Sequence, residues 1–241
     1  MRKRNSSDIA REIAQLHVAE SRFGIWFISS ETWATHVLQP AIDDLKRLIK
    51  NDKASYPVIV DVGCGSGRSF KMLRDRFAPQ HLIGVDIDPK MLSLSEAEAA
   101  KHGIAVHLKR SALSDLPLGD ATVDMVFCHQ TFHHLVDQEK SICEFHRVLK
   151  PGGVLLFAES TRAYIHSWII RLLFRHPLEV QKTAAEYLTM IRNAGFDVAS
   201  DAISYPYLWW SRPDLGLMEQ LGRMPAQTRE ETLLNIVAVR R

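Results

Sequence analysis

The stretch that most constrains the fold is VIVDVGCGSGRSF, residues 58–70, where an apolar run reaches an acid and then three alternating glycines. A short apolar run bounded by glycines is typical of a strand buried on both faces, as in a parallel sheet. Gly63, Gly65 and Gly67 remove side chains just where a helix begins, so a ligand can lie against bare backbone there. The stretch therefore predicts an α/β sheet with a ligand at its first strand–helix turn.

Strands and helices alternate after this turn. Short runs with β-rich composition predict further strands at 81–87, 105–110, 123–128 and 154–159, and helical spacing predicts helices at 67–77, 88–101 and 138–149. A capping box and a closing glycine predict a helix at 183–195, followed by strands within 196–210 and 232–241. The fold class that follows is a doubly wound, Rossmann-like sheet, mostly parallel with an antiparallel last strand and with helices on both faces.

Two segments stand outside this alternation. Residues 1–52 predict helices at 8–20 and 31–50, which form an N-terminal helical lid, and residues 53–241 form the core. Residues 161–178 are apolar around much of a helical circumference and follow the fifth strand, so they predict a helical insert on the substrate side.

Composition excludes several classes of protein. Hydrophobic residues make up 46% and charged residues 24% of 241 residues, as in an ordinary globular protein. A net charge of +2 without an internal basic cluster gives no indication of a nucleic-acid partner. The sequence shows no signal peptide and no apolar run of about 20 residues, so we expect a cytoplasmic protein whose oligomeric state stays open.

The glycine loop distinguishes two kinds of nucleotide ligand. A dinucleotide fingerprint requires G-x-G-x-x-G, but Arg68 stands where the third glycine belongs. Asp86 ends the second strand about 20 residues after the loop, where a carboxylate can accept hydrogen bonds from a ribose diol. The missing glycine disfavours a nicotinamide-dependent oxidoreductase, which stays open as an alternative function. A further alternative is a protein that binds the cofactor without catalysis.

Four ordered segments carry a resemblance to a known family: VDVGCGSG, GVDIDPKML, LSDLPLGDATVDMVFCHQTFHHL and RVLKPGGVLLFAE. In order and spacing they resemble the class I S-adenosylmethionine-dependent methyltransferases, in particular the small-molecule branch that includes the ubiquinone and menaquinone C-methyltransferases. The resemblance covers residues 57–160. It implies an enzyme of the EC 2.1.1 class with S-adenosyl-L-methionine as cofactor.

The resemblance also implies roles for individual residues. Asp61 and Gly63 face the methionine end of the cofactor, and Asp86 holds the ribose. The other implied cofactor contacts come from the glycine loop and from the segments that follow the second, third and fourth strands: Cys64, Gly65, Gly67, Ile87, Met91, Ala112, Leu113, His129 and Gln130. One departure concerns the adenine, because Ala112 stands where relatives often carry an aspartate, so backbone groups of Ala112 and Leu113 are expected to replace it.

The chemistry of a sulfonium cofactor limits what the protein must add. Its methyl group is already activated, so the protein mainly positions a nucleophile in a dry pocket. Where the acceptor carries a proton, His133 and His134 are the candidate bases, because histidine titrates near neutral pH. His129 and His133 share a helical spacing that can hold a metal, but the sequence offers no third ligand beside them, so we predict no metal site.

Two segments rich in large apolar residues predict the acceptor's chemistry. The first contains Trp26, Phe27 and Trp33, and the second contains Tyr164 and Trp168. We expect these segments to meet as a lid over the methyl group, with a hydrophobic aromatic, quinone-like or lipid-like small molecule beneath them. Arg171 and Arg175, one helical turn apart, would then allow weak contact with a membrane surface.

Overall fold

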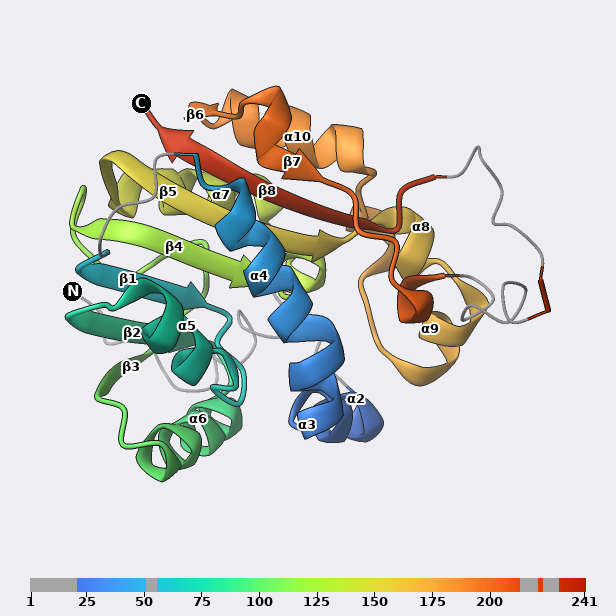
Figure 1. Cartoon of the computed structure of the whole chain (residues 1–241), viewed down its shortest axis with the longest axis horizontal. Coiled ribbons are helices and arrows are strands. Elements are labelled where there is room, and N and C mark those ends of the chain that lie inside the picture. The colour runs from blue at the N-terminus through green and yellow to red at the C-terminus, as the bar shows by residue number, and fades with distance from the viewer. Residues whose placement is uncertain (1–20, 51–55, 213–220, 223–229) are drawn as a thin grey trace, which may run out of the picture.

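The computed structural model describes residues 21–50, 56–212, 221–222 and 230–241. The helix expected at 8–20 lies outside them. Within the described chain the strands form an eight-stranded sheet in the order β3-β2-β1-β4-β5-β8-β6, with β7 pairing to β8 (Figure 1). Helices flank both faces of this sheet, so the prediction of a doubly wound, Rossmann-like fold is confirmed.

The parallel part of the sheet agrees closely with the predicted alternation. Its strands are β1 (Val58–Val62), β2 (His81–Asp86), β3 (Val106–Arg110), β4 (Val123–His129) and β5 (Leu149–Ser160). The connecting helices are α5 (Ser69–Phe77), α6 (Pro89–Lys101) and α7 (Gln138–Val148). Because β1, β2, β4 and β5 run in parallel, their carboxyl ends meet at one edge of the sheet.

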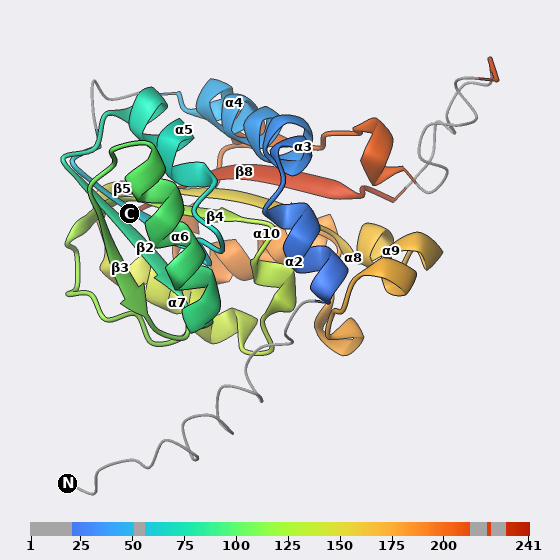
Figure 2. The same cartoon turned by 90° about the horizontal axis from the view of Figure 1, so that it is seen from below.

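Alternation along the strands sends side chains into two separate cores. Ile59, Met125 and Phe127 join the core that α4 (Gln39–Leu48) and α5 cover. Val60 and Val126 face the core that α7 and α10 (Ala184–Asn193) cover. Figure 2 shows α4 and α5 on one side of the sheet and α7 and α10 on the other. Successive side chains of a strand point to opposite faces of the sheet, and helices cover both faces. Each of these strands therefore appears in the sequence as a continuous apolar run.

The N-terminal segment is helical but not one continuous helix. It comprises α2 (Arg22–Ile28), α3 (Glu31–Trp33), a π-helical turn (Ala34–Leu38) and α4. The Ser21 and Ser30 side chains accept hydrogen bonds from backbone amides at the starts of α2 and α3, which explains the break between them. The helix expected at 31–50 therefore includes a π-helical segment.

The C-terminal part departs further from the predicted elements. The expected antiparallel last strand is present as β8 (Leu233–Arg240), paired with β5. The strand expected within 196–210 is reduced to β6 (Phe196–Asp197) and β7 (Ile203–Ser204), separated by a 3-10 turn at Ser200–Ala202. The insert at 161–178 contains two short helices, α8 (Arg162–Ile165) and α9 (Trp168–Leu173), beyond the end of β5 (Figure 1).

Candidate functional site

The glycine loop between β1 and α5 has the backbone that only glycine adopts easily. Gly63, Gly65 and Gly67 have φ values of 70°, 52° and 78°. A Cβ on Gly63 would lie 2.0 Å from the Thr131 side chain, and one on Gly67 would lie 2.8 Å from Phe70, whereas one on Gly65 has nothing within 4 Å. Protein side chains therefore fill the space above two of the glycines, and Gly65 is the position that stays open for a ligand.

Asp86 is fixed against this loop. Its Oδ2 accepts a hydrogen bond from the Gly65 amide at 2.9 Å, and its Oδ1 accepts one from the Asp88 amide at 2.9 Å. A narrow cavity of about 40 Å³ lies beside it, and Gly63, Ile87, Ala112 and Leu113 contribute to its lining. The structure thus brings together the loop, the expected ribose carboxylate and the residues expected beside the adenine.

The other residues expected around the cofactor lie further from this cavity. Met91 is buried on α6 and is not among the residues that line it. Cys64 is buried, and burial raises the pKa of its thiol well above the usual value, which keeps the thiol protonated. Asp61 is buried beneath the loop, where its carboxylate accepts a hydrogen bond from Ser69.

The buried Asp61 gives folding stability a defined pH dependence. Burial raises the pKa of its carboxyl to about 7, the Ser69 hydrogen bond lowers it, and the nearby Asp86 carboxylate raises it. Because the folded-state pKa lies above the unfolded value, the folded protein binds more protons, so this residue's contribution to stability falls as pH rises from about 4 to about 7. Between pH 5 and pH 8 we expect the loss to be about 2–3 kcal/mol in the unfolding free energy.

Urea denaturation at pH 5 and pH 8 checks this expectation. Asp61→Asn keeps an oxygen for Ser69 but cannot ionise, so the variant should gain stability relative to the wild type as the pH rises. Asp137→Asn, at an exposed position, is the matched control and should follow the wild type at both pH values. An Asp61→Asn variant that differs from the wild type by the same amount at pH 5 and pH 8 would contradict the assignment.

The end of β4 and the residue that follows it carry two further residues expected at the cofactor, His129 and Gln130. His129 is buried, its ring stacks on Phe127 at a centroid distance of 6.0 Å, and Trp33 meets it edge-on at 5.3 Å. Burial lowers the pKa of His129 to about 4, and neither ring nitrogen has a hydrogen-bond partner among the described residues. Gln130 follows with φ 50° and accepts a hydrogen bond from Ser160 at 2.6 Å.

His133 is held by a buried carboxylate that is not among the predicted site residues. Glu159, fully buried at the end of β5, lies with its Oε2 2.6 Å from His133 Nδ1. Its Oε1 accepts hydrogen bonds from the backbone amides of Thr131 and Phe132 at 2.8 and 2.7 Å. An acid at the end of an apolar strand is the signal that could have identified it.

A third histidine joins the predicted pair. The ring centroids of His133 and His134 lie 4.4 Å apart, and the His176 ring lies 5.0 and 4.7 Å from them. Burial, and secondarily His133, lower the pKa of His176 to about 3. His176 follows α9, far from the pair in sequence, so no local spacing pattern could have predicted this meeting.

An apolar cavity of about 270 Å³ is lined in part by His133, His134 and His176. Phe27 and Trp33 line it from the N-terminal segment, and Tyr164 lines it from the insert. The two segments meet: the Phe27 and Phe174 rings lie 6.1 Å apart, and the Ser21 hydroxyl donates to the Leu173 carbonyl at 2.9 Å.

Trp26 and Trp168 are not brought to this cavity. Their exposed fractions are 65% and 70%, and neither is among the residues that line it. Helical spacing explains both positions, because Phe27 and Ile169, their neighbours in sequence, face the cavity instead.

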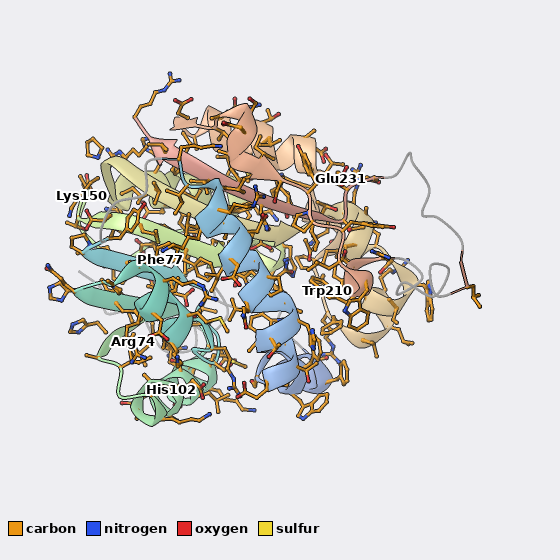
Figure 3. The ribbon with its side chains drawn as sticks, viewed as in Figure 1. Arg74, Phe77, His102, Lys150, Trp210 and Glu231 are labelled. Atoms are coloured by element: carbon orange, nitrogen blue, oxygen red, sulfur yellow. The ribbon has the colours of Figure 1, made fainter. Side chains whose placement is uncertain are left out.

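Trp210, from the C-terminal segment, also lines the apolar cavity, although it is not among the predicted site residues (Figure 3). Its ring meets Tyr164 edge-on at 5.5 Å, and its indole N–H donates to the His36 carbonyl at 3.0 Å. Trp210 thereby connects the insert with the N-terminal helices at the edge of the cavity.

Comparison with known proteins identifies the fold and the cofactor. Residues 60–157 match the family model described as a methyltransferase domain. A probable S-adenosylmethionine-dependent methyltransferase of Mycolicibacterium smegmatis is 31% identical over 141 residues, 58% of this chain and 52% of that protein. A demethylmenaquinone methyltransferase of Thermus thermophilus is 33% identical over 101 residues, 42% of this chain and 46% of that protein. The chain thus spans about half the length of these curated relatives.

Solved structures support the match to methyltransferases at the level of the fold. A methyltransferase of Haloferax volcanii, in complex with the Trm112 activator, superposes with a TM-score of 0.64 at 22% identity and covers 90% of this chain and 95% of its own. An S-adenosylmethionine-dependent methyltransferase of Aquifex aeolicus gives 0.61 at 18% identity, with 90% and 96% covered. Residues 60–157 thus match a methyltransferase domain, and the relatives and the fold confirm the predicted resemblance to S-adenosylmethionine-dependent methyltransferases and the prediction of S-adenosylmethionine as cofactor.

The residues present fit the nucleoside half of that cofactor. Gly65 leaves open space, the Asp86 carboxylate lies against the loop, and Ile87 and Leu113 offer apolar surface beside it. Beside Gly63, where the resemblance places the methionine end, Thr131 donates a hydrogen bond to the Gly63 carbonyl at 3.1 Å, so a bound cofactor would share this space with the threonine side chain. Among the described helices, none combines the length and apolar character that crossing a membrane requires.

Proposed function

We propose that this protein transfers the methyl group of S-adenosylmethionine to a hydrophobic, aromatic or quinone-like small molecule bound in the apolar cavity. The observation that carries the proposal is the position of this cavity. It lies at the carboxyl ends of β4 and β5, and the segment 129–134 that lines it also borders the narrow cavity beside Asp86. Ligands of open α/β sheets bind at this edge.

The lining of the cavity supports the acceptor class. None of its described lining residues is Lys, Arg, Asp or Glu; its polar groups are Gln130, Ser160 and three histidines, besides the tyrosine and tryptophan side chains. Among the relatives, some are named demethylmenaquinone or ubiquinone biosynthesis methyltransferases and others malonyl-[acyl-carrier protein] O-methyltransferases. A malonyl carboxylate calls for a cationic partner, so this cavity favours an uncharged ring over an acid.

The chain's own residues would position the acceptor and take its proton. The bound cofactor supplies a sulfonium-activated methyl group. Gly65 and Asp86 would hold its nucleoside half, and the aromatic walls would exclude water from the acceptor. With Nδ1 of His133 directed at Glu159, its Nε2 is the nitrogen left to accept a hydroxyl proton, which favours His133 over His134 as the base of the predicted pair.

Matched tryptophan variants test the acceptor site. Trp210→Ala removes an aromatic wall, so we expect KM for a quinol-like phenol to rise about 10- to 100-fold, the equivalent of roughly 1.5–3 kcal/mol of buried apolar surface. Trp168→Ala removes the same side chain from outside the cavity and should leave KM unchanged. Steady-state assays that follow S-adenosylhomocysteine release check both values.

The acceptor panel contains the phenol, a fatty acid and a polar amine. Methylation of the amine alone, with equal KM values for the two tryptophan variants, would overturn the proposal. Retention of labelled S-adenosylmethionine without product from any acceptor would instead favour a cofactor-binding protein that has lost methyl transfer.

Weak contact with a membrane surface stays a proposal for the exposed side of α9. Trp168 and Leu172 are 70% and 74% exposed there, beside the exposed Arg171. Apolar side chains flanked by arginine suit an anionic lipid surface. Sedimentation with anionic and neutral vesicles tests it, and equal recovery in both would contradict it.

A further inference from the structure

We propose that His133, His134 and His176 form a binding site for a divalent transition metal ion, zinc foremost, in the wall of the apolar cavity. Nothing in the methyltransferase chemistry requires such a site. The proposal rests on the convergence of three imidazoles from two distant segments, on the carboxylate behind one of them, and on the hydrogen bonds that hold the two segments together.

The three rings lie close enough together to form an open metal site after small rotations. One ligand nitrogen from each histidine lies within 4.8 Å of the other two. In a tetrahedral zinc site with Zn–N bonds of about 2.0–2.1 Å, ligand nitrogens lie about 3.3 Å apart. Small rotations of the three rings would therefore close the site.

Glu159 supplies the outer contact that metal-binding histidines usually make. Metal-bound imidazoles almost always donate their other ring N–H to a carboxylate or carbonyl, which fixes the tautomer and the ring orientation. His133 has this arrangement, with Nδ1 2.6 Å from Glu159 Oε2. Its Nε2 is then the nitrogen that can bind the ion. The fully buried carboxylate also places a negative charge behind the site, which favours a cation there.

A buried glutamine fixes the two segments that carry the histidines. Gln181 Nε2 donates to the His133 carbonyl at 2.8 Å and to the Pro177 carbonyl, next to His176, also at 2.8 Å. The side chain is only 6% exposed, so these bonds are protected from water. These two hydrogen bonds hold the segments of His133 and His176 in a fixed relative position, as a preorganised binding site requires.

The ligand set indicates the metal and its use. Imidazole nitrogens suit zinc, iron, nickel and copper, and three protein ligands with an open fourth position are typical of catalytic rather than structural zinc. All three histidines line the apolar cavity, so the open position faces the space proposed for the acceptor. There the ion would bind and orient an acceptor oxygen in place of the base role of His133. This last step rests on the proposed function; metal binding itself does not.

Direct metal titration tests the site. Tag-free protein, stripped with a chelator, is titrated with Zn²⁺ against a chromophoric competitor. We expect one ion per chain, and we expect His134→Ala and His176→Ala each to weaken binding by at least about tenfold, with Glu159→Gln in the range of 10- to 100-fold. His107→Ala, which removes an exposed imidazole on β3, is the matched control and should bind as the wild type does. Co²⁺ loading should give the intense visible absorption of a tetrahedral site in the wild type and in His107→Ala, but not in His134→Ala or His176→Ala.

The outcomes separate this inference from the proposed function. His176 lies outside the helices and strands, so its alanine variant should keep the wild-type circular dichroism and remain interpretable. Equal zinc affinity in the wild type and His176→Ala, or no wild-type binding, would overturn the metal site and show that the three rings only pack together. Tight zinc binding without methyl transfer to any acceptor would support the site while removing the proposed function.

Discussion

Asp86→Ala should weaken binding of S-adenosylmethionine by tens- to several-hundred-fold, about 2–4 kcal/mol. The carboxylate is expected to accept charge-assisted hydrogen bonds from the ribose diol, which are about twice as strong as neutral ones. The carboxylate also accepts a hydrogen bond from the Gly65 amide. Its removal would therefore leave the backbone at Gly65, the loop glycine with open space above it, without this anchor. Isothermal calorimetry with S-adenosylmethionine and S-adenosylhomocysteine measures the loss.

Asp88→Ala is the matched control for this prediction. Asp88 lies two positions further on and caps α6, with its side chain accepting a hydrogen bond from the Lys90 amide at 2.8 Å. Its loss should cost about 1 kcal/mol of folding stability while leaving cofactor affinity close to that of the wild type. Affinity of Asp86→Ala within twofold of the wild type would exclude Asp86 as the ribose ligand. Gly63→Val is a poorer test, because its Cβ would collide with Thr131 and disturb the fold.

The sequence predicted what local patterns encode. The order of the parallel strands and their helices follows from apolar runs, caps and glycines, each read within a few residues. Thr183 and Glu186 form the predicted capping box at the start of α10, and β8 pairs antiparallel with β5. The glycine loop and Asp86 were predictable for the same reason, since consecutive elements of a doubly wound sheet place them at one edge.

What the sequence could not predict depends on contacts between distant segments. The insert at 161–178 is apolar on most sides, so its periodicity does not define an inner face, and the break between α8 and α9 turns Trp168 outward. His176 meets His133 only because the chain returns to the end of β4 after α9. Buried Glu159 makes contacts with Thr131, Phe132 and His133, all in the segment that follows β4, and no spacing rule describes them.

Glu159→Leu should destabilise the fold by about 3–5 kcal/mol. The substitution is close in volume, but it leaves the Thr131 and Phe132 amides without the acceptor that they share, and each buried unpaired donor costs about 1–3 kcal/mol. His133 loses its partner as well. Urea denaturation followed by circular dichroism measures the change. Glu139→Leu is the control: Glu139 on α7 is 71% exposed in its pair with Lys182, and an exposed pair contributes at most about 1 kcal/mol.

Glu159→Gln separates the stabilising role of this side chain from its effect on His133. The amide oxygen can still accept from the Thr131 and Phe132 amides, so most of the stability should remain. The amide nitrogen, however, would then face His133 Nδ1 as a donor, which forces the imidazole into the opposite tautomer, with the proton on Nε2. A nitrogen in that state can neither accept a proton from the acceptor nor bind an ion. The glutamine variant should therefore fold while losing most of its methyl transfer, and a stable variant with wild-type activity would show that the carboxylate serves the fold alone.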